Sequence, residues 1–119
     1  MKPGWIFVAP ALLIAAAPPP DAATKDDLRC FLIMGSLAGT AKEGPGMQTA
    51  VAGTLYFLGR LEDRAPALDI EAAGAAELLA MTEADFQKDK PRCLAVIEEK
   101  GKRLIAIGAA IDKRLKQAR

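Results

Sequence analysis

The sequence predicts an all-α fold, a small bundle of three to four helices held by one disulfide. Apolar residues recur at intervals of three and four along several stretches, and no useful length alternates as a β-strand would. Glycine and proline stand between these stretches, where they favour turns. The 119 residues include only two cysteines, Cys30 and Cys93, which are the candidates for the disulfide.

The first seventeen residues are typical of a secretory signal. Lys2 precedes an apolar run from Trp5 to Ala17 that ends in three alanines. The run is shorter than the roughly 20 residues that span a membrane, and a proline interrupts it. We expect residues 1–17 to be removed, with an uncleaved anchor as the alternative, and we place the protein in the periplasm or outside the cell. A Pro-rich leader (18–23) and a single helical domain (24–119) would follow.

Export determines how the two cysteines are interpreted. In an oxidising compartment, two thiols in one small domain usually pair. The spacing of Cys30 and Cys93 is unlike the Cys-x-x-Cys of a redox site, so we expect a structural bridge, with redox chemistry as the alternative. Closing a loop of this length restrains the unfolded chain by about 4 kcal/mol in the loop-entropy model.

The first half of the domain predicts two helices. Thr24, with Asp27 three residues later, is a suitable start for the first helix, and the Gly- and Pro-containing residues 43–46 end it. The second helix is expected over residues 47–63, with a boundary at Pro66. Small residues in this helix allow a neighbouring helix to approach closely: Ala50, Ala52, Gly53 and Gly59.

The second half predicts a short third helix and a longer last one. Asp69 is a suitable N-cap for the third helix, which should end near Met81. Thr82 with Asp85 would begin one further turn, and Pro91 suits the first position of the last helix. We expect an apolar stripe of that helix to lie in the core: Leu94, Ile97, Gly101, Leu104, Gly108, Ile111 and Leu115.

Two placements of side chains follow from these helices. Cys30 and Cys93 would point inward near the starts of the first and last helices, so a bond between them favours roughly parallel neighbours. Tyr56 and Phe57 cannot both face the core, and we expect one there and the other at its rim. Arg60 follows Tyr56 by four residues, which places its guanidinium to cover the ring.

Composition excludes several kinds of function. The chain contains no histidine, which removes the commonest general base and the commonest metal ligand. Adjacent acidic residues such as Glu98 and Glu99 diverge on a helix and do not form a catalytic pair. The formal net charge is +1, whereas nucleic-acid binders normally carry a basic excess. We therefore expect no enzyme activity, no cofactor, no metal and no nucleic-acid partner.

Two features are candidates for a surface that contacts a protein partner, although ordinary packing and solvation explain both. Tyr56 and Arg60 form one, at the edge of the second helix. Lys102 and Arg103 form the other, within a basic C-terminal stretch. A membrane surface would suit that basic face, but we do not expect it, because the core needs the apolar stripe opposite and cations favour a helix C-terminus.

Residues 24–117 resemble the small secreted helical proteins common in bacterial genomes, a resemblance that implies no activity. It rests on the signal, on Leu28-Arg29-Cys30-Phe31-Leu32, on Tyr56-Phe57-Leu58-Gly59-Arg60-Leu61 and on Arg92-Cys93-Leu94. In plan the chain is also similar to the acid-stress chaperones of the periplasm, which are short, helical and held by one disulfide. Cys30-Phe31-Leu32 stands where those chaperones have Cys-x-x-Phe-Leu, with two residues fewer.

These observations favour a non-enzymatic periplasmic or secreted protein that works by binding a protein partner. The partner and the oligomeric state stay open at this point. One alternative is an acid-stress chaperone, which would open at low pH as its carboxylates are protonated. A further alternative is an immunity or inhibitor protein that acts against a toxin in the same compartment.

Overall fold

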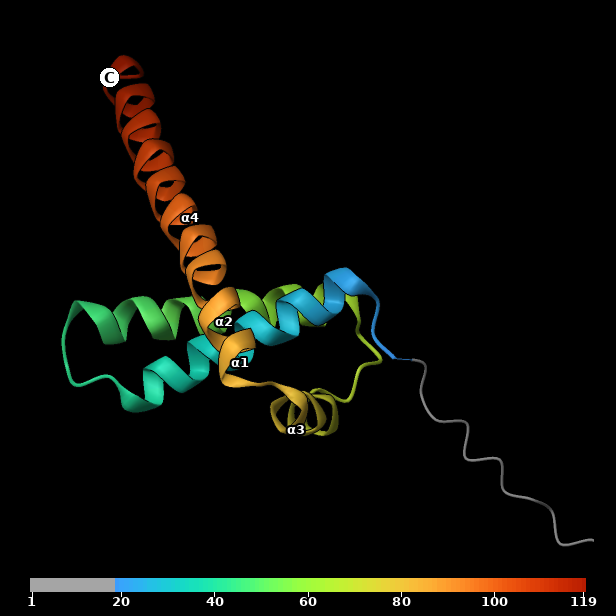
Figure 1. Cartoon of the computed structure of the whole chain (residues 1–119). Helices are drawn as coiled ribbons and strands as arrows, with labels where there is room; N and C mark the ends of the chain where they lie inside the picture. Colours follow the sequence, from blue (N-terminus) through green and yellow to red (C-terminus); the bar gives the residue numbers. More distant parts are fainter. Residues whose placement is uncertain (1–18) are drawn as a thin grey trace, which may run out of the picture.

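The computed structural model describes residues 19–119, which contain four helices joined by short loops. They are α1 (Ala22–Thr40), α2 (Pro45–Arg64), α3 (Ile70–Ala80) and α4 (Glu83–Gln117), and they confirm the all-α class. The signal predicted over residues 1–17, and Pro18 of the leader, lie outside the described residues. Figure 1 shows α1 and α2 as an antiparallel pair, with α3 beside α1 and with α4 crossing the pair and continuing away from it.

Capping residues determine where the first three helices begin. Asp21 caps α1 by accepting the backbone N–H of Thr24 at 2.8 Å, so this helix begins two residues before its predicted start. α2 begins after Gly44, whose φ of 128° lies in the left-handed region that favours glycine. Asp69 caps α3, as predicted, and accepts the N–H of Ala72 at 3.0 Å.

α4 is one continuous helix that runs through Pro91. Thr82 and Asp85 form a capping box, and the helix begins at Glu83. The prediction that the last helix begins at Pro91 is therefore wrong. A proline inside a helix costs about 3 kcal/mol, and anchoring on both sides of it keeps the helix continuous. Three residues hold these turns in or against the core: Phe86, Asp89 and Cys93.

The core lies between α1, α2 and the first half of α4. Cys30 and Cys93 form the predicted bridge, with their Cα atoms 5.3 Å apart. Gly53 lets α2 approach closely, because a methyl group there would collide with Met34 of α1. The buried apolar residues are Leu28, Cys30, Ile33, Met34, Ala50, Phe57, Leu61 and Cys93.

The bridge does not join two helix starts. Because α4 begins at Glu83, Cys93 lies three turns into it, and Cys30 lies near the middle of α1. Figure 1 shows α4 crossing α1 at this point and not running alongside it. The expected parallel arrangement of these two helices is therefore wrong.

The second half of α4 lies outside the core. Leu94 and Ile97 pack against the core as predicted, but every residue from 102 to 119 is exposed. The prediction that the stripe is buried along its whole length is therefore wrong beyond Gly101. The physical reason is the crossing: α1 and α2 lie across the root of α4, and no helix of residues 19–119 accompanies its second half (Figure 1).

Candidate functional site

Beside the disulfide, Arg29 of α1 ties three helices together. Its guanidinium donates hydrogen bonds to Glu77 of α3 and to Asp89 of α4, the latter at 3.1 Å, and Asp85 Oδ1 lies 3.8 Å away. Arg92 donates to the other oxygen of Asp89 at 3.4 Å. The hydrogen bond to Glu77, together with that to Asp89, raises the pKa of Arg29 above its ordinary value, although burial opposes the shift.

The sequence contains a signal for this cluster that helical periodicity does not reveal. Arg29 and Arg92 each precede a cysteine of the bridge. Residues adjacent in sequence do not face each other on a helix, so this pattern alone predicts no contact. The bridge brings these neighbours together around one buried carboxylate, Asp89. Asp89 and Glu77 were not predicted, because their partner Arg29 lies 60 and 48 residues away in the sequence.

A second cluster joins α1 to α2. Asp27, only 4 % exposed, accepts a hydrogen bond from Arg60 at 3.2 Å and lies 3.2 Å from Nε of Arg64. The guanidinium of Arg60 lies 5.7 Å from the centre of the Tyr56 ring and donates to the Tyr56 hydroxyl at 3.3 Å. This hydrogen bond and the charge of Asp27 raise the pKa of Arg60, against the effect of burial. Phe57 is buried and meets Tyr56 edge to face, which confirms one ring in the core and the other at its rim.

The four residues predicted as a possible partner surface occupy separate places. Tyr56 and Arg60 lie on α2, where Arg60 donates hydrogen bonds to the Tyr56 hydroxyl and to Asp27. Lys102 and Arg103 lie on the exposed half of α4, where Lys102 pairs with Glu98 at 3.3 Å. Among the described residues no hydrogen bond or ion pair joins the two pairs, and a role for either as a partner surface stays a prediction.

The second half of α4 exposes apolar side chains that the sequence analysis placed in the core. Leu104 is 70 % exposed, Ile111 52 % and Leu115 56 %, and Ile105 and Ile107 beside them are also exposed. Gly101 and Gly108 lie on the same face, and a methyl group added at either would have nothing within 4 Å. A glycine inside a helix costs about 1 kcal/mol, and packing within the single chain does not explain these two. We call the following residues the α4 stripe: Leu94, Ile97, Gly101, Leu104, Gly108, Ile111 and Leu115.

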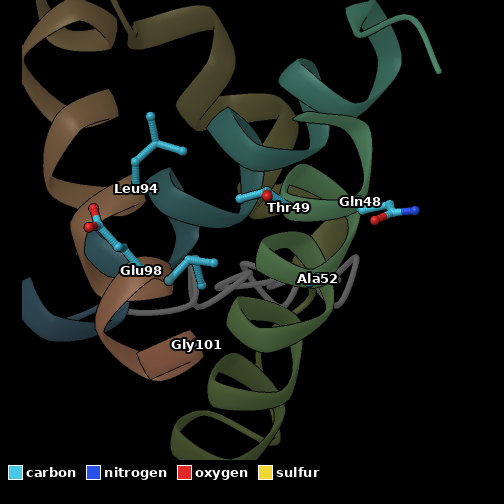
Figure 2. Close-up of a pocket in the computed structure, with 7 residues that line it drawn as sticks. Gln48, Thr49, Ala52, Leu94, Glu98 and Gly101 are labelled. Carbon is cyan, nitrogen blue, oxygen red and sulfur yellow. The ribbon is translucent and has the colours of Figure 1, made fainter. Parts of the chain in front are cut away.

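A groove lies where α4 leaves the bundle. It encloses about 630 Å³ between α2 and α4. Figure 2 shows the turns of α4 that carry Leu94, Glu98 and Gly101 beside the part of α2 that carries Thr49 and Ala52. Gln48, Ile97 and Gly101 complete the lining. Because three of the lining residues belong to the α4 stripe, the groove and the exposed stripe form one continuous apolar track.

Two other kinds of site, a metal centre and a membrane-spanning helix, are not found in the described residues. Residues 19–119 contain no group of three or more side chains placed to hold a metal ion. None of the helices in this range is long and apolar enough to cross a membrane. No protein-family model, curated protein or solved structure matches the chain. The α4 stripe and its groove are therefore the features on which we base a function.

Proposed function

We propose that this chain is a non-enzymatic helical protein, exported to the periplasm or beyond, that binds another protein through α4. The observation that carries the proposal is the α4 stripe, whose apolar side chains stand exposed along the half of the helix that leaves the bundle. Large apolar patches on soluble proteins mark interaction sites. An amphipathic helix is also one of the recurrent elements by which proteins recognise each other.

The root of α4 supports the proposal, because it is held rigidly. The bridge at Cys93 fixes α4 to α1, and Asp89 binds Arg29 two turns into the helix. A binding element that is already in position loses less conformational entropy on association. Asp89, buried and bound by Arg29 and Arg92, thus acts as a fastening of α4 to α1.

The chemistry of α4 favours a protein over an anionic membrane. Gly101 and Gly108 leave hollows between the large side chains of the stripe, and side chains of a partner helix fit such hollows. Asp112 borders the stripe at 100° per residue and engages one of the basic side chains that an anionic membrane would attract. Lys116 is engaged with Asp112 at 2.8 Å.

Site-specific photo-crosslinking tests the proposal. A benzophenone amino acid is placed at Leu104, on the stripe, in cells that express the whole sequence. Ala106 is the matched control, because it is exposed on the opposite face of the same turn. We expect protein adducts from Leu104 and few from Ala106. Adducts with lipid alone, or none from either position, would contradict the proposal.

A further inference from the structure

We infer that the partner of the α4 stripe is a second copy of this chain, packed antiparallel along residues 97–115. This inference rests on the proposed function, because it names the partner of the same surface. It is argued from the spacing of the stripe, from the sizes of its side chains, from the two isoleucines beside it and from the charge at each end.

The spacing of the stripe is that of paired helices. Successive members lie three and four residues apart without interruption. Between Ile97 and Leu115 the stripe runs about 27 Å, at 1.5 Å per residue. It divides into two sets, each with a repeat of seven: Leu94, Gly101, Gly108 and Leu115 in one, and Ile97, Leu104 and Ile111 in the other.

The sizes of the side chains favour an antiparallel pair. In that arrangement each layer joins a member of one set to a member of the other. When Leu104 of one copy lies against Gly108 of the second, Ile111 lies against Gly101 and Ile97 against Leu115. Each glycine, with open space around it in the single chain, then receives one large side chain.

A parallel pair fills the same space poorly. It would set each residue of the stripe against its own copy, so that Gly101 faces Gly101 and Gly108 faces Gly108. Two layers would stay empty, and voids in an interface lose the contacts that stabilise it. The glycines therefore distinguish the two orientations.

Ile105 and Ile107 mark the centre of the antiparallel pair. In the register above, the twofold axis crosses α4 at the height of Ala106, whose own side chain lies on the opposite face. Each isoleucine lies across this axis from the same residue of the second copy. These residues are 75 % and 41 % exposed in the single chain, although they flank the stripe and do not belong to it. The apolar face of α4 is thus widest where a symmetric pair needs it.

Charge gives the same orientation at the ends of the pair. The tip of α4 is basic, with Lys113, Arg114, Lys116 and Arg119 against a single acid, Asp112. An antiparallel pair carries each tip, with four bases and one acid, to residues 97–103 of the other copy, where two acids, Glu98 and Glu99, partly balance three bases. A parallel pair would place two basic tips side by side, where they repel each other.

Sedimentation of the oxidised protein, expressed from the whole sequence, tests the inference over a range of concentrations. We expect a dimer whose dissociation constant rises at least about tenfold in Leu104→Glu, because a carboxylate would enter an apolar layer. Ala106→Glu, the same change on the opposite face, should leave the dimer intact. Both positions are exposed in the single chain, and circular dichroism checks that each variant keeps its fold.

Gly108→Leu separates an interface role from a local one. Leucine is the better helix former, so a glycine without a partner would be replaced with no loss of dimer. We expect the dimer to weaken although helix content does not fall, because the added side chain fills the hollow that receives Leu104. An unchanged dimer in this variant would overturn the register.

Crosslinking with a short bis-maleimide reports the orientation. The reagent reaches only an added thiol, because Cys30 and Cys93 are bonded. Ile105→Cys should link to its own copy and Leu115→Cys should not, whereas the opposite result indicates a parallel pair and overturns the inference. A protein that stays monomeric, or that binds anionic vesicles without forming a dimer, also overturns it. A monomer whose Leu104 is crosslinked to a different protein in the cell would refute the inference and leave the proposed function standing.

Discussion

Gly53 shows how a single residue sets the distance between helices. It is buried in α2, and a methyl group there would meet Met34 of α1 and Ile97 of α4. Gly59, six residues further along the same helix, is exposed and has nothing within 4 Å of an added methyl group. The two positions form a matched pair that separates packing from helix propensity.

We expect Gly53→Ala to have a free energy of unfolding about 1–2 kcal/mol below that of Gly59→Ala. Both changes gain the same helix propensity, but only the first forces core side chains out of place. Urea unfolding followed by circular dichroism measures the difference. Equal stabilisation by the two changes would show that Met34 yields without cost.

At the residue scale, local relations were predictable and distant ones were not. Asp69 accepts the backbone N–H three residues later, and Arg60 covers the ring of the residue four positions earlier. Local helical geometry alone places both side chains. Glu77 and Asp89 reach Arg29 only because the bundle brings α3 and α4 to α1. No spacing in the sequence encodes that meeting.

Pro91 decides how the last element is interpreted. The sequence prediction treated it as a first helical position, where its missing N–H is harmless. In the structure it lies inside α4 and is exposed, so that it interrupts the helical hydrogen bonding without a packing role for its ring. The capping box at Thr82 and the anchored turn at Asp89 outweigh this local preference.

We expect Pro91→Ala to raise the free energy of unfolding by about 1–2 kcal/mol. The change restores a backbone hydrogen bond, and part of that gain is offset by the greater freedom of the unfolded chain. Pro45→Ala, at the start of α2, is the control and should give no increase. Thermal unfolding of the two variants, measured against the parent protein, decides the point, and equal midpoints for both would contradict it.

The periodicity of α4 predicted its apolar face correctly and its environment wrongly. A repeat of three and four indicates that a helix has one apolar face. It does not say whether the chain itself or another molecule covers that face. For Leu94 and Ile97 the covering is the bundle, and for Leu104, Ile111 and Leu115 the described residues supply none.

At the scale of the whole molecule, one covalent bond and two ion-pair clusters hold the bundle together. The bridge closes a loop of 63 residues between α1 and α4. The clusters join Arg29 to carboxylates of α3 and α4, and Asp27 to arginines of α2. Acid acts on contacts that need a charged carboxylate, and it leaves the bridge intact.

Acid should therefore loosen this protein below about pH 4 and not near neutrality. Hydrogen bonds from the backbone N–H groups of Thr82 and Thr24 lower the pKa of Asp85 and of Asp21. The stability that these charged caps contribute is complete above the ordinary aspartate value of about 4 and is lost as the pH falls through the lowered values. The chain has no histidine, and its two cysteines are bonded, so it lacks the side chains whose ordinary pKa values lie nearest to neutrality.

The bridge adds a second, pH-independent contribution, which reduction removes. Breaking the bridge returns conformational entropy to the unfolded chain and lowers the free energy of unfolding by about 4 kcal/mol in the loop-entropy model. We therefore expect the reduced protein to lose its packing at a higher pH than the oxidised protein. Near- and far-ultraviolet circular dichroism with dye binding, from pH 8 to pH 2 in both redox states, measures the two transitions. Identical acid midpoints would show that the bridge does not hold the fold, and an oxidised spectrum unchanged at pH 2 would exclude the acid-opened state that a chaperone of the acid-stress kind requires.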